Sequence, residues 1–496
     1  MVLYFSVGSE TCSLSREELR DGLVAGLRAW EKDASCSEEK KKKKRVMLIP
    51  PDFTRYHSRA GDLTVFAYEH FGDEVTDIMP ALGTHAPVSD AQREKMFPGL
   101  PQNLFRVHDW RNDVVTIGHV PAEMVRQASD GKVDEPWPAQ LNKLVWEGGH
   151  DLVLSIGQVV PHEVMGMANY NKNMFVGVGG SDAINFSHFI GAVYGMERMM
   201  GRADNPLRRI LNYASEKYMK GKIPVVYVLT VIGRDEATGA MVPRGLFIGP
   251  DQEAFDRAAA LSLKVNFTLV PEPLHHVVVY LDPEKYHSTW IGNKAVYRTR
   301  MAMADGGKLI IIAPGVHMFG EDEGIDAMIR KYGYRTTPEV LKFLEDGRDL
   351  MKNLSAAAHL IHASSEGRFS ITWCPGKLSK EEVESVGFLY ADCEQMMRAY
   401  GVPNALKEGW NEQEDGERFF YISNPAVGLW AHEGRFNHGD TAAASSGDSS
   451  TSFVANAGAQ ASLDASIGGG PFEVPPADSR PQLKRQRTSG SNECGK

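Results

Sequence analysis

The chain has 496 residues, of which 42% are hydrophobic and 24% are charged, and its formal net charge is −10. These values are typical of a globular protein with a buried core, and the acidic balance argues against a general nucleic-acid-binding protein. No apolar run reaches the roughly 18–20 residues that span a bilayer, and the N-terminus lacks the basic segment of a secretory signal. Five widely spaced cysteines form no CxxC pair, which fits a reducing compartment. We therefore expect a soluble, cytoplasmic protein with no membrane segment.

The first predicted elements are a helix over Arg16–Trp30 and a charged loop near residues 37–45. The loop contains the like-charged run Lys40–Arg45, and such runs are usually solvated. At the other end of the chain, residues 438–496 are rich in Ser, Ala, Gly and Pro and have few large apolar side chains. This composition cannot offset the entropy of ordering, so it predicts a disordered tail with no part in chemistry.

Between these segments, short apolar runs followed by polar turns predict buried strands. The runs are Val46–Ile49, Leu152–Ile156, Val225–Val231, His276–Tyr280 and Leu309–Ala313. Helical patterns such as Thr337–Phe343 lie between them, and this alternation predicts an α/β fold with parallel sheets covered by helices. Ligands in such folds bind beyond the carboxyl ends of the strands, which directs attention to the residues just after each strand.

A break near Gly249–Phe255 predicts two α/β domains, residues 1–250 and 251–437, with an active-site cleft between them. The segment 401–437 is expected to pack back on either of the two blocks. We find no internal sequence repeat.

Polar side chains follow the first predicted strand and the short run that ends at Pro80. Asp52, Thr54 and Arg55 leave the first strand together, and an arginine can bind a carboxylate or phosphate bidentately. The other interpretation of this segment is an Asx turn with a surface arginine. Gly83-Thr84-His85 forms the next loop, and a lone histidine in a loop is more often structural than catalytic.

The strand Leu152–Ile156 leads into the most informative segment. His162 and Lys172 precede the glycines of residues 177–180, and His188 follows them. The glycines could cradle a phosphate, but the spacing matches neither GxGxxG nor HExxH. A lysine with a lowered pKa could form a covalent bond. Farther along, Lys294 is expected to be solvated unless it faces the first block across a cleft.

Together these segments resemble the nickel-pincer lactate racemase family. The family's Asp-x-Thr-Arg motif matches Asp52–Arg55, and its Gly-Thr-His motif matches Gly83–His85. Its third motif is Pro-His, then a lysine ten residues after that histidine, then a histidine sixteen residues on; Pro161-His162, Lys172 and His188 reproduce it. The resemblance is good over roughly residues 45–200, weaker over 255–400 and absent in the tail.

The resemblance implies a cofactor and its sites. The family's cofactor is a pyridinium-3-thioamide-5-thiocarboxylate mononucleotide that binds nickel, and it would be tethered covalently to Lys172. His188 would coordinate the nickel, which imidazole suits. Asp52 would orient the cofactor or a neighbouring side chain, and Gly179 and Gly180 would approach the cofactor phosphate. Residues 1–250 would then be the cofactor-binding domain, and enzymes that synthesise the cofactor would be partners of this chain.

The resemblance also implies racemisation or epimerisation of a 2-hydroxy acid. Hydride leaves Cα while a base takes the hydroxyl proton, and hydride returns to the other face of the planar 2-keto acid. His85 and His162 would be the acid/base pair, since imidazole titrates near neutral pH. Arg55 and Lys294 would hold the substrate carboxylate.

Three departures from the family pattern concern the surroundings of these residues. Ala86 stands where the family has Arg, Ala168-Asn-Tyr-Asn171 replaces Ser-Gly-Gly-Arg before the lysine, and Ile291 replaces a Gln. The catalytic residues are thus present while the substrate pocket is altered, so a longer or more polar 2-hydroxy acid, such as a dicarboxylate or a sugar acid, is as plausible as lactate. Two alternatives stay open: a nicotinamide-dependent oxidoreductase, and a binding protein that has lost catalysis.

Overall fold

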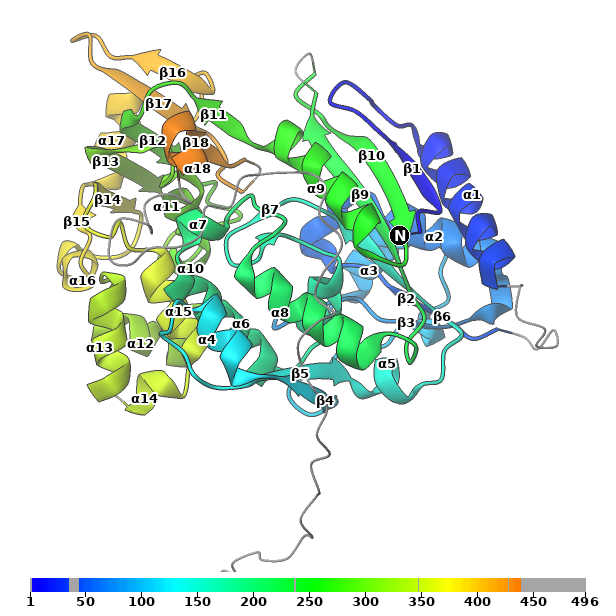
Figure 1. The fold of residues 1–496 in the computed structure, drawn as a ribbon. Coiled ribbons are helices and arrows are strands. Elements are labelled where there is room, and N and C mark those ends of the chain that lie inside the picture. Colours follow the sequence, from blue (N-terminus) through cyan, green and yellow to red (C-terminus); the bar gives the residue numbers. More distant parts are fainter. Residues whose placement is uncertain (1, 35–43, 236–237, 347, 427, 439–496) are drawn as a thin grey trace, which may run out of the picture. The chain divides into compact units, whose positions relative to one another are not determined.

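The computed structural model describes residues 2–34, 44–235, 238–346, 348–426 and 428–438. Most of the charged loop predicted near residues 37–45, and the predicted tail beyond His438, lie outside these residues. The described part contains two six-stranded sheets with helices on their faces (Figure 1). It confirms the predicted α/β class.

The first sheet has the strand order β1-β10-β9-β6-β2-β3. Strands β9, β6, β2 and β3 are parallel, and β10 and β1 are added antiparallel at one edge. The strands are β1 (Phe5–Gly8), β2 (Val46–Ile49), β3 (Val75–Ile78), β6 (Leu152–Gln158), β9 (Val225–Arg234) and β10 (Met241–Gly249). The strands predicted over Val46–Ile49, Leu152–Ile156 and Val225–Val231 are confirmed.

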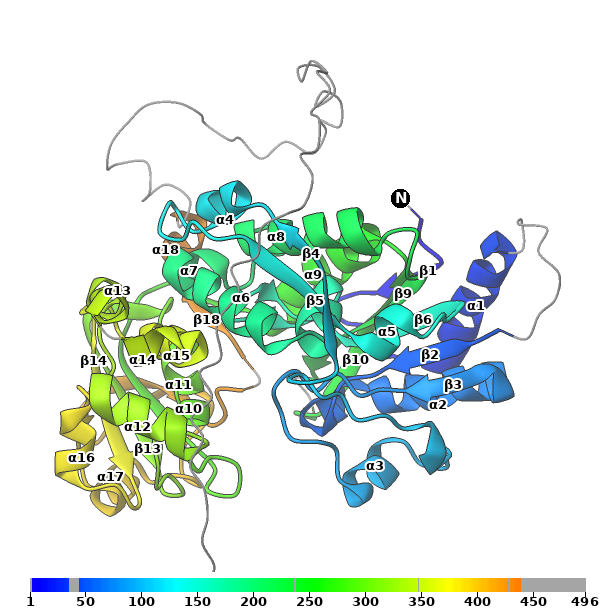
Figure 2. The ribbon, with the colours of Figure 1, turned by 90° about the horizontal axis from the view of Figure 1, so that it is seen from below.

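Alternate residues of these strands pack on opposite faces, as the two-residue period of a strand requires. Leu48 and Leu154 face one buried cluster, which includes the leucines of helix α1. Met47 and Val153 face the other cluster. Helix α1 (Arg16–Ala34) begins where Ser15 and Glu18 cap each other, through a bond of 2.8 Å from the Ser15 amide to the Glu18 carboxylate. It extends the predicted helix by four residues, and it packs beside α2, as Figure 2 shows.

The first sheet and the other elements up to Asn266 form what we call the first half of the structure. These other elements cover the sheet or extend from it. The helices are α2 (Ala60–Phe71), α3 (Asp90–Met96), α4 (Ala122–Ala128), α5 (Lys143–Glu147), α6 (Ser181–Tyr194), α7 (Met196–Met199), α8 (Pro206–Ala214) and α9 (Gln252–Asn266), with short turns η1 (Phe53–Ser58), η2 (Gly72–Glu74), η3 (Gln102–Leu104), η4 (Asn173–Gly177) and η5 (Ser215–Met219). Two small ribbons join β4 (Val114–Val120) with β5 (Trp137–Asn142) and β7 (Pro161–His162) with β8 (Gly166–Met167).

The second sheet has the order β15-β14-β13-β12-β17-β16, and all its neighbours are parallel except β16 and β17. The strands are β12 (Leu274–Tyr280), β13 (Met303–Ala313), β14 (Ser370–Pro375), β15 (Leu389–Tyr390), β16 (Gly409–Glu412) and β17 (Arg418–Ile422). The strands predicted over His276–Tyr280 and Leu309–Ala313 are confirmed, and both begin earlier than predicted. Segment 401–437 packs back on this half through β16 and β17, and β18 (Trp430–His432) pairs with β11 (Thr268–Val270).

Helices α10 (Thr289–Gly292), α11 (Lys294–Thr299), α12 (Glu323–Tyr332), α13 (Thr337–Asp346), α14 (Arg348–Met351), α15 (Leu354–His362), α16 (Lys380–Ser385), α17 (Cys393–Tyr400) and α18 (Glu433–His438) complete this half. The helix predicted over Thr337–Phe343 starts at the predicted residue and runs three residues longer.

One buried apolar cluster contains side chains of both sheets, including Val153 of β6 and Val277 of β12. Helix α9, which begins within the predicted break, packs on β9 and β10 of the first sheet (Figure 1). The change from one sheet to the other therefore comes after α9, and the division into domains at residue 250 stays a prediction. Among the described residues, no helix is long and apolar enough to cross a membrane.

Candidate active site

The candidate residues follow strands β2, β3 and β6, whose carboxyl ends meet at one edge of the first sheet. The parallel register pairs Ile49 with Ser155 and Leu48 with Ile78. Just beyond the strands, Pro51 forms a bridge with Ala81. The segments that carry Asp52 and His85 are therefore neighbours, as the rule for parallel sheets leads us to expect.

Asp52 and His85 form a hydrogen-bonded pair. The distance from His85 Nδ1 to Asp52 Oδ2 is 2.5 Å, and Asp52 also accepts from the amide and hydroxyl of Thr54. Burial raises the pKa of Asp52, but His85 and Thr54 outweigh this effect and hold the pKa below its usual range. The ionised carboxylate thus accepts the Nδ1–H of His85. The Nε2 of the ring, whose side chain is 61% exposed, is left with a lone pair.

The loop that carries His85 is tied to the turn that follows Lys172. The Gly83 amide donates to the Gly177 carbonyl at 2.8 Å. Gly83 has a φ of 58°, a left-handed conformation that glycine adopts without strain. On the other side, the Asn173 side chain donates to Ser155 Oγ at 3.0 Å. These bonds bring Lys172 to the same edge of the sheet as the Asp52–His85 pair.

The residues before Lys172 adopt an unusual backbone. Asn169 and Tyr170 have φ of 64° and 60°, although neither is glycine. They occupy the two positions at which the family that the sequence resembles has Gly-Gly. The Asn169 side chain accepts from the Tyr170 amide at 2.7 Å, and the Tyr170 ring stacks on Phe255 at 5.1 Å. Local contacts therefore replace the conformational freedom of the glycines.

Arg208 of α8 stabilises this left-handed turn by hydrogen bonds. Its guanidinium donates to the Asn169 carbonyl at 3.2 Å, to Asn171 Oδ1 at 2.6 Å and to the Met167 carbonyl at 2.5 Å. Arg208 is 1% exposed, so these bonds form away from water. An arginine distant in sequence thus supports the backbone just before Lys172.

The Lys172 amine has no hydrogen bond or ion pair with any other described side chain. Burial and the nearby Arg55 lower the pKa of Lys172 to about 8, and Glu163 opposes this change. A substantial fraction of the amine is therefore uncharged near neutral pH, which is the nucleophilic form.

His188 lies on α6 and has a defined tautomer. Its Nδ1 donates to the Ile184 carbonyl at 2.7 Å, so Nε2 carries the lone pair. Burial lowers the pKa of His188 to about 4, and Lys172 is close enough to contribute to this shift. A neutral imidazole with a free Nε2 is suited to bind a metal ion. Within the described residues, no group of three or more His, Cys, Asp or Glu side chains could hold a metal, so His188 would need other donors beside it.

His162 is 9% exposed and has the opposite tautomer. Its Nδ1 accepts from the Val164 amide at 3.1 Å, so the proton of the neutral ring is on Nε2. Burial holds the pKa of His162 well below its ordinary value, although Glu163 opposes this effect. In this state the Nε2–H of His162 is able to donate a hydrogen bond.

Helix α11 of the second half reaches this site. Arg298 donates to the Pro161 carbonyl at 3.0 Å and pairs with Glu163 at 3.3 Å. Lys294, one turn earlier, is close enough to Glu163 for that carboxylate to affect its pKa, which burial lowers. Lys294 therefore faces the first half of the structure. From the sequence, we expect Lys294 to be solvated unless it does so.

Arg55 lies in the same group of charges. Burial and Arg298 lower the pKa of Arg55, while Glu163 and Asp52 raise it. The Arg55 guanidinium forms no ion pair with the other described side chains. Two cations, Arg55 and Lys294, are thus free to bind an anionic ligand.

Packing within the protein explains why residues 179 and 180 are glycines, without any ligand. A Cβ at Gly179 would lie 1.9 Å from the Phe175 carbonyl oxygen, and one at Gly180 would lie 2.4 Å from Gln140 Oε1. The Gly179 carbonyl also accepts from His108 at 2.9 Å. Internal packing explains both glycines, and their approach to a phosphate stays a prediction.

The sequence did not identify Glu163, Arg298 and Arg208. Glu163 directly follows His162 in the sequence. Arg298 lies one helical turn after Lys294, so the helical spacing from Lys294 could have suggested Arg298. Arg208 gives no sequence signal, because its partners lie about 40 residues away.

The fold and site are those of an α/β protein whose polar residues gather at the carboxyl edge of a parallel sheet. Residues 22–200 match the family model described as the lactate racemase N-terminal domain. Over these residues the chain is similar to lactate racemases. No curated protein matches the sequence.

Two solved structures share the fold over most of the chain. A Thermotoga maritima protein is 24% identical, with a TM-score of 0.68, and the match covers 86% of this chain and 100% of that one. The lactate racemase apoprotein from Thermoanaerobacterium thermosaccharolyticum is 17% identical, with a TM-score of 0.60, and the match covers 86% of this chain and 94% of that one.

Proposed function

We propose that this protein is a racemase or epimerase of a 2-hydroxy acid that uses a nickel-pincer nucleotide attached to Lys172. The observation that carries the proposal is the combination of a free, partly neutral amine at Lys172 with a neutral imidazole at His188 whose Nε2 has no partner among the described residues. These groups fit the cofactor, since one can form the covalent bond and the other can bind nickel. When bound, the nucleotide would supply the hydride acceptor.

The Asp52–His85 pair is the proton acceptor in this proposal. Asp52 accepts a hydrogen bond from the Nδ1–H of His85, so the proton of the neutral ring stays on Nδ1. Nε2 of His85 can then take the hydroxyl proton of the substrate. Asp52 also stabilises the imidazolium that results. The exposed ring of His85 can then exchange its proton with water.

His162 acts from its buried position as a donor toward the substrate oxygen. Its Nε2–H can stabilise negative charge that develops on that oxygen. For His162 to accept a proton at Nε2, its Nδ1 must first lose the Val164 amide as a partner. The two histidines are therefore not equivalent in the described state.

Arg55 and Lys294 would bind the substrate carboxylate, one from each half of the structure. Glu163 lies near both cations, but its ion pair is with Arg298, so it leaves the two cations able to bind a second carboxylate. Burial lowers the pKa of both cations, and an anionic ligand restores the electrostatic balance. This arrangement would orient Cα and its hydroxyl between His85 and His162.

The test is peptide mass spectrometry on protein co-expressed with the cofactor-synthesis enzymes in medium containing nickel. We expect the peptide that contains Lys172 to carry the nucleotide, and the protein to reduce the optical purity of at least one 2-hydroxy acid. Lys172→Arg keeps the charge but cannot form the bond, so adduct and activity should fall to background. Lys294→Arg is the matched control and should keep the adduct.

An unmodified Lys172 together with no retained nickel would contradict the proposal and favour a nicotinamide-dependent or non-catalytic protein. Racemisation by protein made without the cofactor supply would also contradict it.

A further inference from the structure

Helix α15 carries two buried histidines one turn apart, His359 and His362, which are 7% and 5% exposed. Burial lowers the pKa of each to about 3. Both rings are therefore neutral at physiological pH and can form hydrogen bonds as neutral groups. Neither residue belongs to the motifs that indicate the cofactor site.

His359 has partners that explain its burial. Its Nε2 is 3.1 Å from the Tyr334 hydroxyl, which is also 2.8 Å from Thr289 Oγ1. Its ring stacks on Trp290 with a centroid distance of 4.0 Å. His359 is thus a satisfied residue of the core.

His362 lacks such partners. Its Nε2 is fully buried and has no hydrogen-bond partner among the described residues. Buried polar atoms in folded proteins are nearly always paired, and an exception calls for a partner that binds later, such as a ligand or an ordered water. His359, on the same helix and equally buried, does have a hydrogen-bond partner for its Nε2.

The position of His362 relates it to the candidate active site. Helix α15 packs against α6, which carries His188, and both ribbon views show the two helices side by side (Figures 1 and 2). The Glu163 carboxylate and the His188 ring are close enough to influence the pKa of His362.

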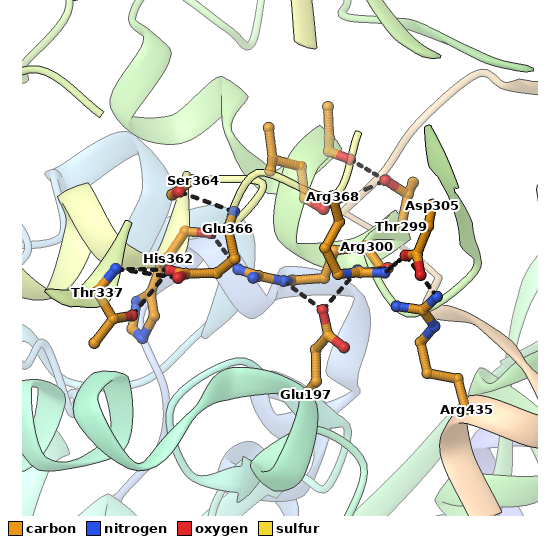
Figure 3. Close-up of polar contacts among 12 residues, drawn as sticks. Glu197, Thr299, Arg300, Asp305, Thr337, His362, Ser364, Glu366, Arg368 and Arg435 are labelled. Atoms are coloured by element: carbon orange, nitrogen blue, oxygen red, sulfur yellow. Dashed lines mark hydrogen bonds and ion pairs between the residues drawn. The ribbon is translucent and has the colours of Figure 1, made fainter. Parts of the chain in front are cut away.

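The backbone of His362 is fixed by an ion-pair network. Arg300 Nη1 donates to the His362 carbonyl at 3.1 Å, and Arg300 Nε donates to Glu197 at 3.1 Å (Figure 3). Glu197 also accepts from Arg368 at 2.7 Å. An imidazole held at a fixed backbone position, whose Nε2 has no partner among the described residues, is a preorganised hydrogen-bonding group.

We infer that His362 is a substrate-specificity residue, and that it binds a second hydroxyl group, on the carbon next to Cα of the 2-hydroxy acid. This inference rests on the proposed function. A hydroxyl matches a neutral imidazole because it can donate to the ring or accept from it. A second carboxylate fits less well, since it would lie near the ionised Glu163. The expected substrate class is therefore 2,3-dihydroxy acids and longer sugar acids.

The test compares glycerate, which has this second hydroxyl, with lactate, which lacks it, using the full-length holoenzyme. We expect kcat/KM to be higher for glycerate. His362→Leu should lower the glycerate-to-lactate ratio of kcat/KM about tenfold, the value typical of one lost hydrogen bond. His362→Gln, which keeps a donor and an acceptor, should restore part of the ratio. His359→Leu is the matched control and should leave the ratio unchanged.

Calorimetric titration of glycerate and lactate into the same proteins separates this inference from the proposed function. We expect glycerate to bind more tightly than lactate, and His362→Leu to remove the difference. Equal ratios and equal affinities in wild type and His362→Leu would overturn the role of His362, even if lactate is racemised. If no 2-hydroxy acid is racemised, the proposed function fails. The affinities for glycerate and lactate then decide whether His362 binds the second hydroxyl group.

Discussion

At the scale of single residues, the site depends on how each polar atom is already used. Asp52 occupies Nδ1 of His85, a backbone carbonyl occupies Nδ1 of His188, and a backbone amide occupies Nδ1 of His162. The first two histidines present a lone pair at Nε2, and the third presents a proton. Residue type alone gives three identical imidazoles, and their partners give them different chemistry.

The reactivity of Lys172 tests this picture at the residue scale. Because its pKa is lowered to about 8, the neutral fraction of its amine should rise with pH and reach one half near pH 8. At that pH an ordinary lysine, with a pKa of about 10.4, has a neutral fraction roughly a hundredfold smaller. Competitive acetylation of cofactor-free protein, followed by mass spectrometry, should give a midpoint near 8 for Lys172.

Arg55→Met provides the control, since it removes a cation that lowers the pKa of Lys172. The labelling midpoint should move upward in this variant. A midpoint above 10 in the wild type would show that Lys172 is solvated and not prepared for a covalent bond.

At the scale of secondary-structure elements, the turn before Lys172 shows how the chain departs from the family pattern without losing the backbone conformation. Asn169 and Tyr170 hold left-handed φ angles, which cost of order 1–3 kcal/mol each for residues other than glycine. Stacking on Phe255 and three bonds from Arg208 offset this strain. Helix α8 is thus part of the support for the site.

Arg208→Met should destabilise the protein by about 3 kcal/mol, because it leaves three buried acceptors without a donor. Arg209→Met is the matched control. Arg209 is the next residue, its side chain is 64% exposed, and its partner Asp204 is 69% exposed, so the change should stay below about 1 kcal/mol. Urea unfolding measures both values, and equal losses would show that Arg208 does not support the turn.

At the scale of the compact unit of residues 1–445, Glu197 joins the two halves of the described structure. It lies on α7, after the first sheet's helix α6, and it pairs with Arg300 and Arg368, which flank strands β13 and β14 of the second sheet. Arg368 also pairs with Asp305, as does Arg435 of α18. Segments distant in sequence therefore meet in one network of charges.

Glu197→Gln should lower the free energy of unfolding by about 2–3 kcal/mol, since it leaves the buried Arg300 without a carboxylate and removes one of the two carboxylates that pair with Arg368. Glu394→Gln, which breaks an exposed pair with Arg398, is the control and should cost less than about 1 kcal/mol. Denaturant unfolding of both variants distinguishes these outcomes, and a loss no larger than that of Glu394→Gln would mean that the network does not hold the halves together.

The sequence by itself determined the α/β class, five of the strands and the list of residues that carry the proposed chemistry. It could do so because apolar runs report burial locally, and because the motifs around Asp52, His85, Lys172 and His188 are short. Only the tertiary structure decided which ring nitrogens carry a lone pair and that Arg208 supports the turn before Lys172. It also decided that, among the described residues, Nε2 of His359 has a hydrogen-bond partner while Nε2 of His362 has none. These properties depend on contacts between residues far apart in the chain, and no local pattern encodes the partner of a buried polar atom.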